Sequence, residues 1–352
     1  MSLSRLNVRS FRCLTHVELT LDSEQNFIFG PNGAGKTSLL EAVHVLGRGR
    51  SFRLRQNKRL IQRGAAAFSV YGEVKTKSHS SRLGIRVDND GRQLRLDGES
   101  GAAMASFARI LPVYVIEPRV HLLIEGGPGE RRRFLDWGVF HVEHGYIGAW
   151  RRYRRVLGQR NAALRSGQDA STWDEGLSLA GMHITGARIR YATQLRKALE
   201  GLGEGLLGQR LDLVYRTGWR ADATLEGALR KSRPRDEHTG VTQVGPHRAE
   251  LEIRLGERGV REEISRGQQK LAAAALVLAQ VRVLAQSRGR GGILLVDDPA
   301  AELDARALRG FLLVLDTLPA QRIITGLSPA SLPQSQGCRT FHVEQGEVRP
   351  ML

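Results

Sequence analysis

The segment that most constrains the fold is residues 27–46, which read FIFGPNGAGKTSLLEAVHVL. Three apolar residues at 27–29 predict a short buried strand, and the glycine-rich stretch after them predicts a loop. Apolar residues at 39, 40, 43 and 46 then recur at helical spacing. Strand, glycine-rich loop and helix, in this order, form the context in which the pattern G-x-x-x-x-G-K-[ST] binds phosphate groups.

The residue types in this loop suit a nucleoside triphosphate. Glycine lets backbone N–H groups approach phosphate oxygens without a clash from Cβ, and the N-terminus of the next helix adds partial positive charge. We expect Lys36 to contact the β- and γ-phosphates of ATP and the Thr37 hydroxyl to hold Mg²⁺. The ATP-binding residues predicted in the loop are Gly30, Pro31, Asn32, Gly33, Ala34, Gly35, Lys36, Thr37 and Ser38.

A second apolar strand ends in two acidic residues. Residues 293–298 read ILLVDD, so Asp297 and Asp298 stand at the carboxyl end of a predicted buried strand, where open α/β sheets bind their ligands. We expect Asp297 to hold Mg²⁺, directly or through water, and Asp298 to polarise the attacking water. Paired acids at a turn are common, but here they follow a phosphate loop. We therefore predict ATP hydrolysis with Asp298 and Lys36 as catalytic residues.

The chain carries a large excess of positive charge. Of 352 residues, 53 are Lys or Arg and 36 are Asp or Glu, which gives a formal net charge of +17. This excess favours an anionic partner, nucleic acid or a membrane surface, although an arginine-rich composition alone also produces it. The charge is concentrated at 47–64, where seven cations occur without an acid, and at 131–165. The predicted DNA contacts are Arg48, Arg50, Arg53, Arg55, Lys58, Arg151, Arg152, Arg154 and Arg155.

Other classes of protein are disfavoured by composition. Cys13 and Cys338 are the only cysteines, so neither a disulfide framework nor a C-x-x-C metal site is expected. His141 and His144 are three residues apart but lack an evident third ligand, and we predict no metal site there. The chain has no signal-peptide pattern and no apolar run of about 18 residues. We expect a reducing, cytoplasmic location without a membrane partner.

The remaining patterns predict an α/β protein with a helical insertion. Alternating residues predict strands within 2–21 and 67–97, and apolar runs predict strands at 111–116 and, last in the chain, at 322–327. Helical spacing dominates from about 131 to 207, a strand is expected at 211–219, and short helices are expected at 224–232 and 305–315. We predict three segments: 1–128 and 241–352 form the two parts of an ATPase head, and 129–240 forms a mainly helical arm.

The motifs and their order resemble an ABC-type ATPase head. The phosphate loop is followed by ISRGQQK at 264–270, and ILLVDD is followed by AAELD at 300–304. In that family the signature serine and glycine contact the γ-phosphate bound to the other protomer, so ATP clamps two heads face to face. The resemblance implies that Ser265, Arg266, Gly267 and Gln268 act in trans and that Asp304 lies at the dimer seam. Arg12 lies in the turn after the first predicted strand. The sequence supports two interpretations of it equally: a contact to the nucleotide, or an ordinary exposed turn residue.

Among such heads, the chain resembles the RecF family of bacterial recombination mediators. The resemblance rests on SFRCLTHVEL near the start, GGPGERRRFLDWG at 126–138, VGPHRAELEI at 244–253, SRGQQKL and LLVDDPAAELD. It implies binding of double-stranded and gapped DNA with ATP, ATP-dependent homodimerisation and slow hydrolysis. It also implies cooperation with RecR and RecO in loading RecA.

Some positions depart from the usual ABC pattern. Asp298 stands where most heads have Glu, and the shorter side chain suits slow turnover. Glu117-Pro118-Arg119 replaces the usual glutamine loop, which leaves the role of this loop open. Thr325 is the residue nearest to the position where transporter heads have a histidine.

Three alternatives compete with a DNA-repair ATPase. A transporter ATPase subunit has its signature much closer to the phosphate loop and needs a membrane partner. An SMC-like coiled-coil ATPase needs long heptads, and the insertion here is short and rich in glycine. An ATP-switched DNA-binding scaffold with little catalysis has the same residues, and the sequence separates it poorly from a hydrolysing switch.

Overall fold

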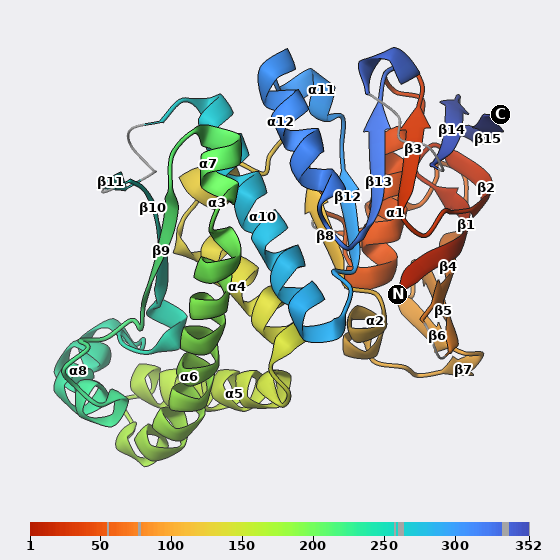
Figure 1. Ribbon diagram of the computed structural model, residues 1–352. Coiled ribbons are helices and arrows are strands. Elements are labelled where there is room, and N and C mark those ends of the chain that lie inside the picture. Colours follow the sequence, from red (N-terminus) through yellow and green to blue (C-terminus); the bar gives the residue numbers. More distant parts are fainter. Residues whose placement is uncertain (55, 77–78, 257, 260–263, 333–337, 352) are drawn as a thin grey trace. The chain divides into compact units, whose positions relative to one another are not determined.

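The computed structural model divides the chain into two compact units (Figure 1). It describes residues 1–352 except 55, 77–78, 257, 260–263, 333–337 and 352. The first unit comprises Met1–Val120 and Val281–Leu352, and the second comprises His121–Gln280. The first unit thus combines both ends of the chain. The arm expected at 129–240 lies within the second unit, which extends beyond it at both ends.

A largely parallel sheet in the first unit has the order β15-β14-β3-β13-β12-β8. Its strands are β3 (Gln25–Phe29), β8 (Val113–Ile116), β12 (Ile293–Val296), β13 (Gln321–Gly326), β14 (Arg339–Glu344) and β15 (Glu347–Met351). Of the strands described in this sheet, only β15 runs antiparallel to its neighbour. Strands β3, β12 and β13 are buried throughout, as expected for parallel strands covered on both faces.

The expectation that 322–327 forms the last strand was wrong, because β14 and β15 follow it. The sequence of β14, RTFHVE, buries only Phe341 and Val343. A segment with only two buried apolar residues gives a weak strand pattern, although β14 pairs with both β15 and β3.

The second sheet of this unit is antiparallel, in the order β2-β1-β4-β5-β6-β7. Its strands are β1 (Ser2–Phe11), β2 (Leu14–Thr20), β4 (Ala67–Lys75), β5 (Ser80–Asp88), β6 (Arg92–Leu96) and β7 (Glu99–Ser100). Helix α1 (Lys36–Arg48) contacts β1, β4 and β5 of this sheet and β8 and β13 of the parallel sheet. The phosphate-loop helix therefore lies in the main core of the unit. The shorter elements are η1 (Asn57–Leu60), α2 (Met104–Ile110), α11 (Pro299–Glu302), α12 (Ala305–Asp316) and η4 (Pro329–Ser331).

The second unit is built around α6 (Asp174–Leu199), which contacts α4, α5, α8 and β9. Its other helices are α3 (Leu122–Glu125), α4 (Pro128–Val142), α5 (Tyr146–Arg165), η2 (Ser171–Trp173), α7 (Leu202–Leu207), α8 (Leu225–Thr239) and η3 (Pro246–Arg248). A small sheet contains β9 (Leu211–Arg216), β10 (Glu250–Leu255) and β11 (Arg258–Gly259). Helix α8 runs past the expected end at 232 to Thr239, with Pro234 inside it. The residues after 232 are polar and have no apolar periodicity, so the pattern did not predict this continuation.

Helix α10 (Arg266–Arg288) begins in the second unit and ends in the first. It is the one described helix whose length and apolar composition would allow it to cross a membrane. However, 72% of its apolar window is buried within the protein, as in a core helix.

Candidate nucleotide site and basic surfaces

The phosphate loop connects β3 to α1. A Cβ on Gly30 would lie 2.1 Å from the Val343 carbonyl oxygen on β14, so only glycine fits there. Gly35 precedes α1 with a φ of 121°, a backbone conformation that side chains rarely adopt. In the described structure no side chain caps this helix. The first backbone N–H groups of α1 are therefore oriented as an anion-binding terminus.

Lys36 lies along the loop that precedes it. Its Nζ donates to the carbonyl oxygens of Gly30 at 2.7 Å and Pro31 at 3.1 Å, and the residue is only 6% exposed. Burial lowers the pKa of Lys36, while the nearby carboxylates of Asp298 and Asp297 act in the opposite direction. The ammonium group is thus held beside the loop, where the sequence places the phosphates.

The side chains of Thr37 and Thr325, from two other segments, both contact the Asp297 carboxylate. The Thr37 hydroxyl lies 3.0 Å from each carboxylate oxygen of Asp297, and the Thr325 hydroxyl donates to Asp297 Oδ1 at 2.9 Å. The strand order explains the meeting: β13, with Thr325, lies between β3, which leads into the loop, and β12, which leads to Asp297. Burial raises the pKa of Asp297, and hydrogen bonds from the two threonines oppose that rise. Hydroxyl and carboxylate oxygens are the donors that Mg²⁺ prefers, so this cluster fits the ion.

Asp298 has a strained backbone and an unsatisfied carboxylate. Its φ is 45°, and its N–H donates to the Thr325 hydroxyl at 2.9 Å. Its Oδ1 is buried without a hydrogen-bond partner among the described residues. Burial is the main cause of its raised pKa, which the Lys36 charge opposes. A buried acceptor without a partner is rare, and it suits a group that receives a hydrogen bond from water.

Thr325 is the site residue that the sequence did not assign. It is completely buried and contacts both acidic residues. The available signal was a single hydroxyl residue directly after the apolar pair Ile323-Ile324 of a strand.

Arg12 contacts the phosphate-loop helix. It has a φ of 56°, and its guanidinium donates to both carboxylate oxygens of Glu41 at 3.0 and 3.1 Å. Glu41 is completely buried in α1 and also accepts a hydrogen bond from Ser51. The Arg12 side chain is 25% exposed, so it is not a freely solvated turn residue. Beside it, Cys13 Sγ lies 3.6 Å from the hydroxyl of Ser38.

The loop at 117–119 lies near Phe52 and the Asp297 carboxylate. Arg119 donates to the Phe52 carbonyl oxygen at 2.9 Å and pairs with Glu117 at 3.7 Å. Burial raises the pKa of Glu117, and the charge of Asp297 adds to that rise. The loop therefore joins the basic segment after α1 to the carboxylates of the site.

The predicted signature residues begin α10. Ser265 N donates to Gln268 Oε1 at 3.0 Å, and Gln268 N donates to Ser265 Oγ at 3.3 Å. This reciprocal pair is a capping box. Ser265, Arg266 and Gly267 are exposed. Asp304, in the first unit, is also exposed and caps α12 through bonds from the N–H groups of Arg306 and Ala307.

The predicted DNA contacts differ in exposure. Arg151, Arg152, Arg154 and Arg155 are exposed on α5, and Arg154 lies over the Trp150 ring at 5.0 Å. Arg50, Arg53 and Lys58 are exposed, and Arg48 is half-buried in α1. Arg55 lies outside the described residues.

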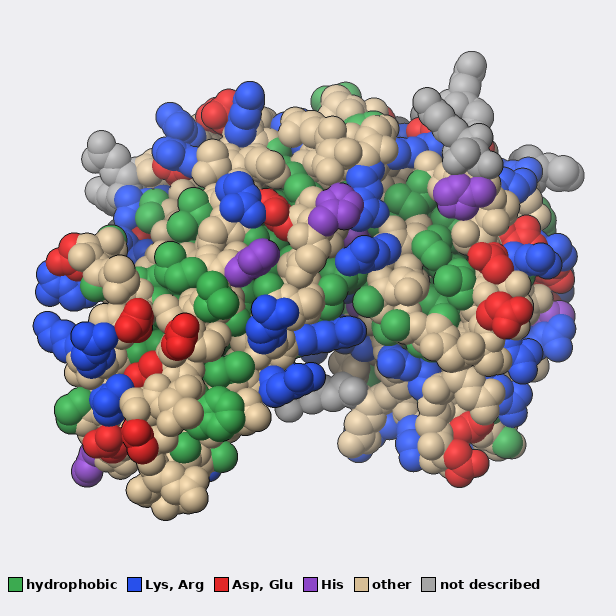
Figure 2. Space-filling model, turned by 90° about the horizontal axis from the view of Figure 1, so that it is seen from below, with side chains coloured by type: hydrophobic (Ala, Val, Ile, Leu, Met, Phe, Trp, Pro, Cys, Tyr) green, Lys and Arg blue, Asp and Glu red, His purple; other side chains and the backbone are tan. Residues whose placement is uncertain are grey.

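Two arginines of the 131–165 segment are structural and do not belong to a basic surface. Arg131 is buried and pairs with Glu250 at 2.7 Å, and Arg160 is completely buried between carboxylates. The positive charge that the sequence concentrates at 131–165 therefore does not all lie on the surface. On the face shown in Figure 2, Lys and Arg side chains stand among acidic and apolar ones.

Comparison with known proteins agrees with this geometry. Residues 2–349 match the family described as RecF/RecN/SMC N terminal domain. The DNA replication and repair protein RecF of Thioalkalivibrio sulfidiphilus is 43% identical over 358 residues, which cover 99% of each chain. That of Stutzerimonas stutzeri is 41% identical, covering 99% of this chain and 97% of the relative.

Solved structures show the same fold. The structure described as the recombination mediator protein RecF-ATP in the RecFOR pathway superposes with a TM-score of 0.88 and 25% identity, covering 100% of this chain and 98% of that one. An Smc head bound to the C-winged helix domain of ScpA has a TM-score of 0.60 at 17% identity and shares the fold alone. This chain therefore belongs to the RecF family, within the RecF/RecN/SMC group, and has the fold of an ABC-type ATPase head.

Proposed function

We propose that this protein is an ATP-dependent DNA-binding recombination mediator that acts in the repair of DNA gaps. The observation that carries the proposal is the cluster of Thr37, Asp297 and Thr325 beside a complete phosphate loop. It occurs in a chain whose full-length relatives are named DNA replication and repair protein RecF. One of the similar solved structures is described as RecF-ATP.

The loop residues bind the triphosphate of ATP. Backbone N–H groups at the start of α1 and the Lys36 ammonium contact phosphate oxygens. Thr37 and Asp297 hold Mg²⁺, which neutralises phosphate charge when bound. Thr325 keeps the Asp297 carboxylate oriented toward Thr37 through its hydrogen bond.

Asp298 assists hydrolysis by accepting a proton from the attacking water. Its unsatisfied Oδ1 provides the acceptor, and the bond from its N–H to Thr325 fixes the backbone on which it stands. We expect slow turnover, because an aspartate reaches less far than the glutamate of most ABC heads.

ATP acts as a switch between monomer and dimer. Exposed Ser265, Arg266 and Gly267, together with Gln268, contact the nucleotide held by a second copy, and Asp304 lies at the seam. For switching, ATP must bind the closed dimer better than the open monomer. Hydrolysis then releases the dimer.

The anionic partner is duplex or gapped DNA, with RecR as a protein partner and RecO and RecA in the same pathway. Exposed arginines on α5 and cations at 50–58 support this proposal. A similar protein of solved structure, described as a recombination mediator in the RecFOR pathway, supports it as well.

An Asp298→Asn variant tests the switch. We expect it to bind ATP, to form a dimer detected by light scattering, and to release phosphate at least tenfold more slowly than the unmodified protein. Asp90→Asn, at an exposed loop position, is the matched control and should behave like the unmodified protein. Unchanged phosphate release by Asp298→Asn would remove Asp298 as the base. If light scattering gave the same molecular mass with and without ATP, ATP-driven dimerisation would be contradicted, and the alternative of a DNA-binding scaffold with little catalysis would be favoured.

A further inference from the structure

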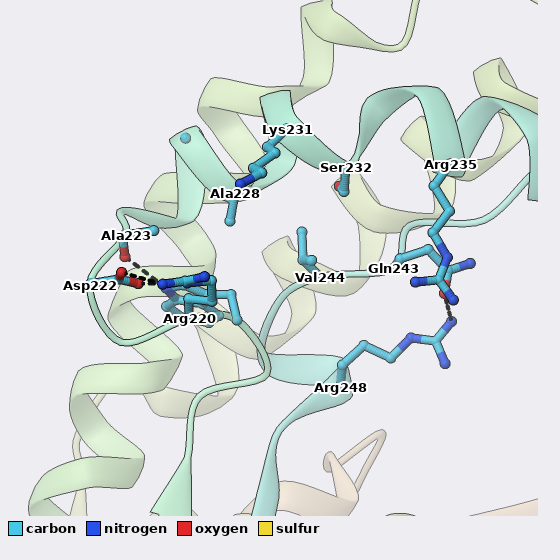
Figure 3. A pocket seen from close by; sticks show the side chains of 12 residues that line it. Arg220, Asp222, Ala223, Ala228, Lys231, Ser232, Arg235, Gln243, Val244 and Arg248 are labelled. Carbon is cyan, nitrogen blue, oxygen red and sulfur yellow. Dashed lines mark hydrogen bonds and ion pairs between the residues drawn. The ribbon is translucent and has the colours of Figure 1, made fainter.

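We propose that a basic pocket in the second unit binds an acidic peptide segment of a partner protein. The pocket has a volume of about 740 Å³, within the range of roughly 300–1,000 Å³ typical of ligand sites. It lies between α8, the loop that precedes α8 and the segment that leads into β10 (Figure 3). We call it the arm pocket; its lining includes Trp219, Arg220, Lys231, Arg235, Val244 and Arg248.

The arm pocket has more cations than acids. Among the described lining residues the single acid is Asp222, and Arg220 pairs with it: its guanidinium donates to both carboxylate oxygens at 3.0 and 2.7 Å. Lys231, Arg235 and Arg248 have no carboxylate within 4.0 Å among the residues that the structure describes. These three charges therefore remain available to an anionic ligand.

Two of these cations converge. Figure 3 shows Arg235, on α8, and Arg248, on the opposite side, pointing toward each other. The Arg248 guanidinium donates to the neutral side chain of Gln243, at 3.3 Å from Oε1. Like charges that face one another repel unless an anion lies between them, and the planar guanidinium matches a carboxylate. This end of the pocket suits one or more carboxylates.

The rest of the lining suits an apolar side chain. Ala223, Gly227, Ala228 and Val244 contribute small or apolar surface. The ring of half-buried Trp219 is fixed, because its indole N–H donates to the Ala223 carbonyl oxygen at 3.1 Å. A ligand with carboxylates next to an apolar group would match both parts of the pocket.

The walls of the arm pocket are fixed before any ligand arrives. A Cβ on Gly218 would lie 2.3 Å from the Gly245 carbonyl oxygen, so glycine lets these two segments touch. Buried Arg160 donates to Asp236 of α8 and to Thr242, both at 2.8 Å. Asp236 in turn accepts from Gln243 N at 2.9 Å. A preformed pocket loses little entropy on binding.

The shape and lining favour a peptide over nucleic acid. A duplex presents a convex surface of phosphates, and its contacts are made along exposed faces. Single strands are held by successive aromatic rings on which bases stack, whereas the described lining contains one aromatic residue. A peptide of acidic and apolar residues uses the cations and the small apolar walls together.

Fluorescence anisotropy with full-length protein tests the proposal. The probe is a fluorescein-labelled peptide of alternating glutamate and leucine residues. The comparison probes are the same peptide with glutamine for glutamate and a labelled oligothymidylate. The charge variant is Lys231→Glu with Arg235→Glu, both at exposed positions. Arg230→Glu, on the same helix but outside the lining, is the matched control. Ala228→Phe fills the pocket without a change of charge.

We expect the acidic peptide to bind the unmodified protein and Arg230→Glu alike. The charge variant should bind at least tenfold more weakly, and Ala228→Phe should also lose binding. ATP hydrolysis should be unchanged in all three variants, because they lie outside the nucleotide site. Equal loss with Arg230→Glu would show general charge attraction and overturn the proposal. Full binding by the charge variant or by Ala228→Phe would do the same, and so would preferential binding of oligothymidylate at the same residues.

Discussion

At the scale of single residues, Asp297 and its neighbours decide what the site can do. The motif patterns predicted Lys36, Thr37, Asp297 and Asp298 because each is specified by its own local segment. Thr325 was not predicted, because its contacts depend on β13 lying between β3 and β12, and no local pattern encodes that order. The Arg12–Glu41 pair was missed for the same reason: Glu41 reads as an ordinary helix residue, yet it is buried.

Lys36→Ala should greatly weaken nucleotide binding. The lysine provides a charged hydrogen-bond donor to phosphate, and such bonds contribute about 1.5–3 kcal/mol, or roughly 10- to 100-fold in affinity. Titration calorimetry with ATP measures the effect, and Lys75→Ala, at an exposed strand position, serves as the control. Normal ATP affinity in Lys36→Ala would end the assignment of the phosphate loop.

Asp297→Asn should make the nucleotide-free protein relatively more stable as pH rises. Burial raises the pKa of Asp297 above its unfolded value. The stability linked to the protonated form is present below the unfolded pKa of about 3.9 and is lost as pH rises through the folded pKa. Asparagine does not ionise, so its advantage in melting temperature should grow from about pH 4 toward neutrality. Asp90→Asn, at an exposed loop position, is the control for the substitution itself, and a growing advantage of the unmodified protein over Asp297→Asn would contradict the account.

At the scale of elements, the sequence patterns predicted most strands and helices. They did not predict where each element ends or which of its side chains are buried. Helix α5 is the clearest case. Its arginines at 151–155 and at 160 look alike in sequence. Only the fold brings Asp174 and Asp236 to Arg160, at 2.8 Å each. One buried guanidinium thereby links α5, α6 and α8.

Arg160→Ala should strongly destabilise the protein. Removing the cation leaves the buried Asp236 carboxylate without its ion pair, while Asp174 keeps Arg233 at 2.8 Å. The loss of one partner from a buried pair costs about 3–5 kcal/mol. Urea unfolding followed by circular dichroism measures the change. Arg230→Ala breaks an exposed pair with Glu226 and should cost about 0–1 kcal/mol. Equal midpoints for the two variants would refute the structural role of Arg160.

At the scale of the whole molecule, one unit combines both ends of the chain and the other is inserted between them. The sequence predicted this insertion from the change to helical spacing and the return of the nucleotide motifs. Its extent was harder to predict, because β9 and β10 lie far apart in sequence and pair within the inserted unit. The expected arm ended before β10.

Replacing Arg151, Arg152, Arg154 and Arg155 with alanine should weaken duplex binding and reduce its salt dependence. Each lost phosphate contact lowers the slope of log K against log salt by about 0.9. Anisotropy titrations at several salt concentrations measure this slope. Arg190→Ala with Arg196→Ala is the control, because these exposed arginines of the same unit are paired with Glu143 and Asp212. An unchanged slope in the quadruple variant would assign the α5 surface to a protein partner.

The central claim is that ATP controls DNA binding through dimerisation. The most direct measurement is the anisotropy of labelled duplex DNA titrated with protein at fixed salt, in ATP and in ADP. The account predicts tight binding with ATP alone, rising with protein concentration as a dimer requires. Weak binding that is the same with ATP and with ADP would contradict it. The net charge of +17 would then explain only nonspecific attraction to DNA.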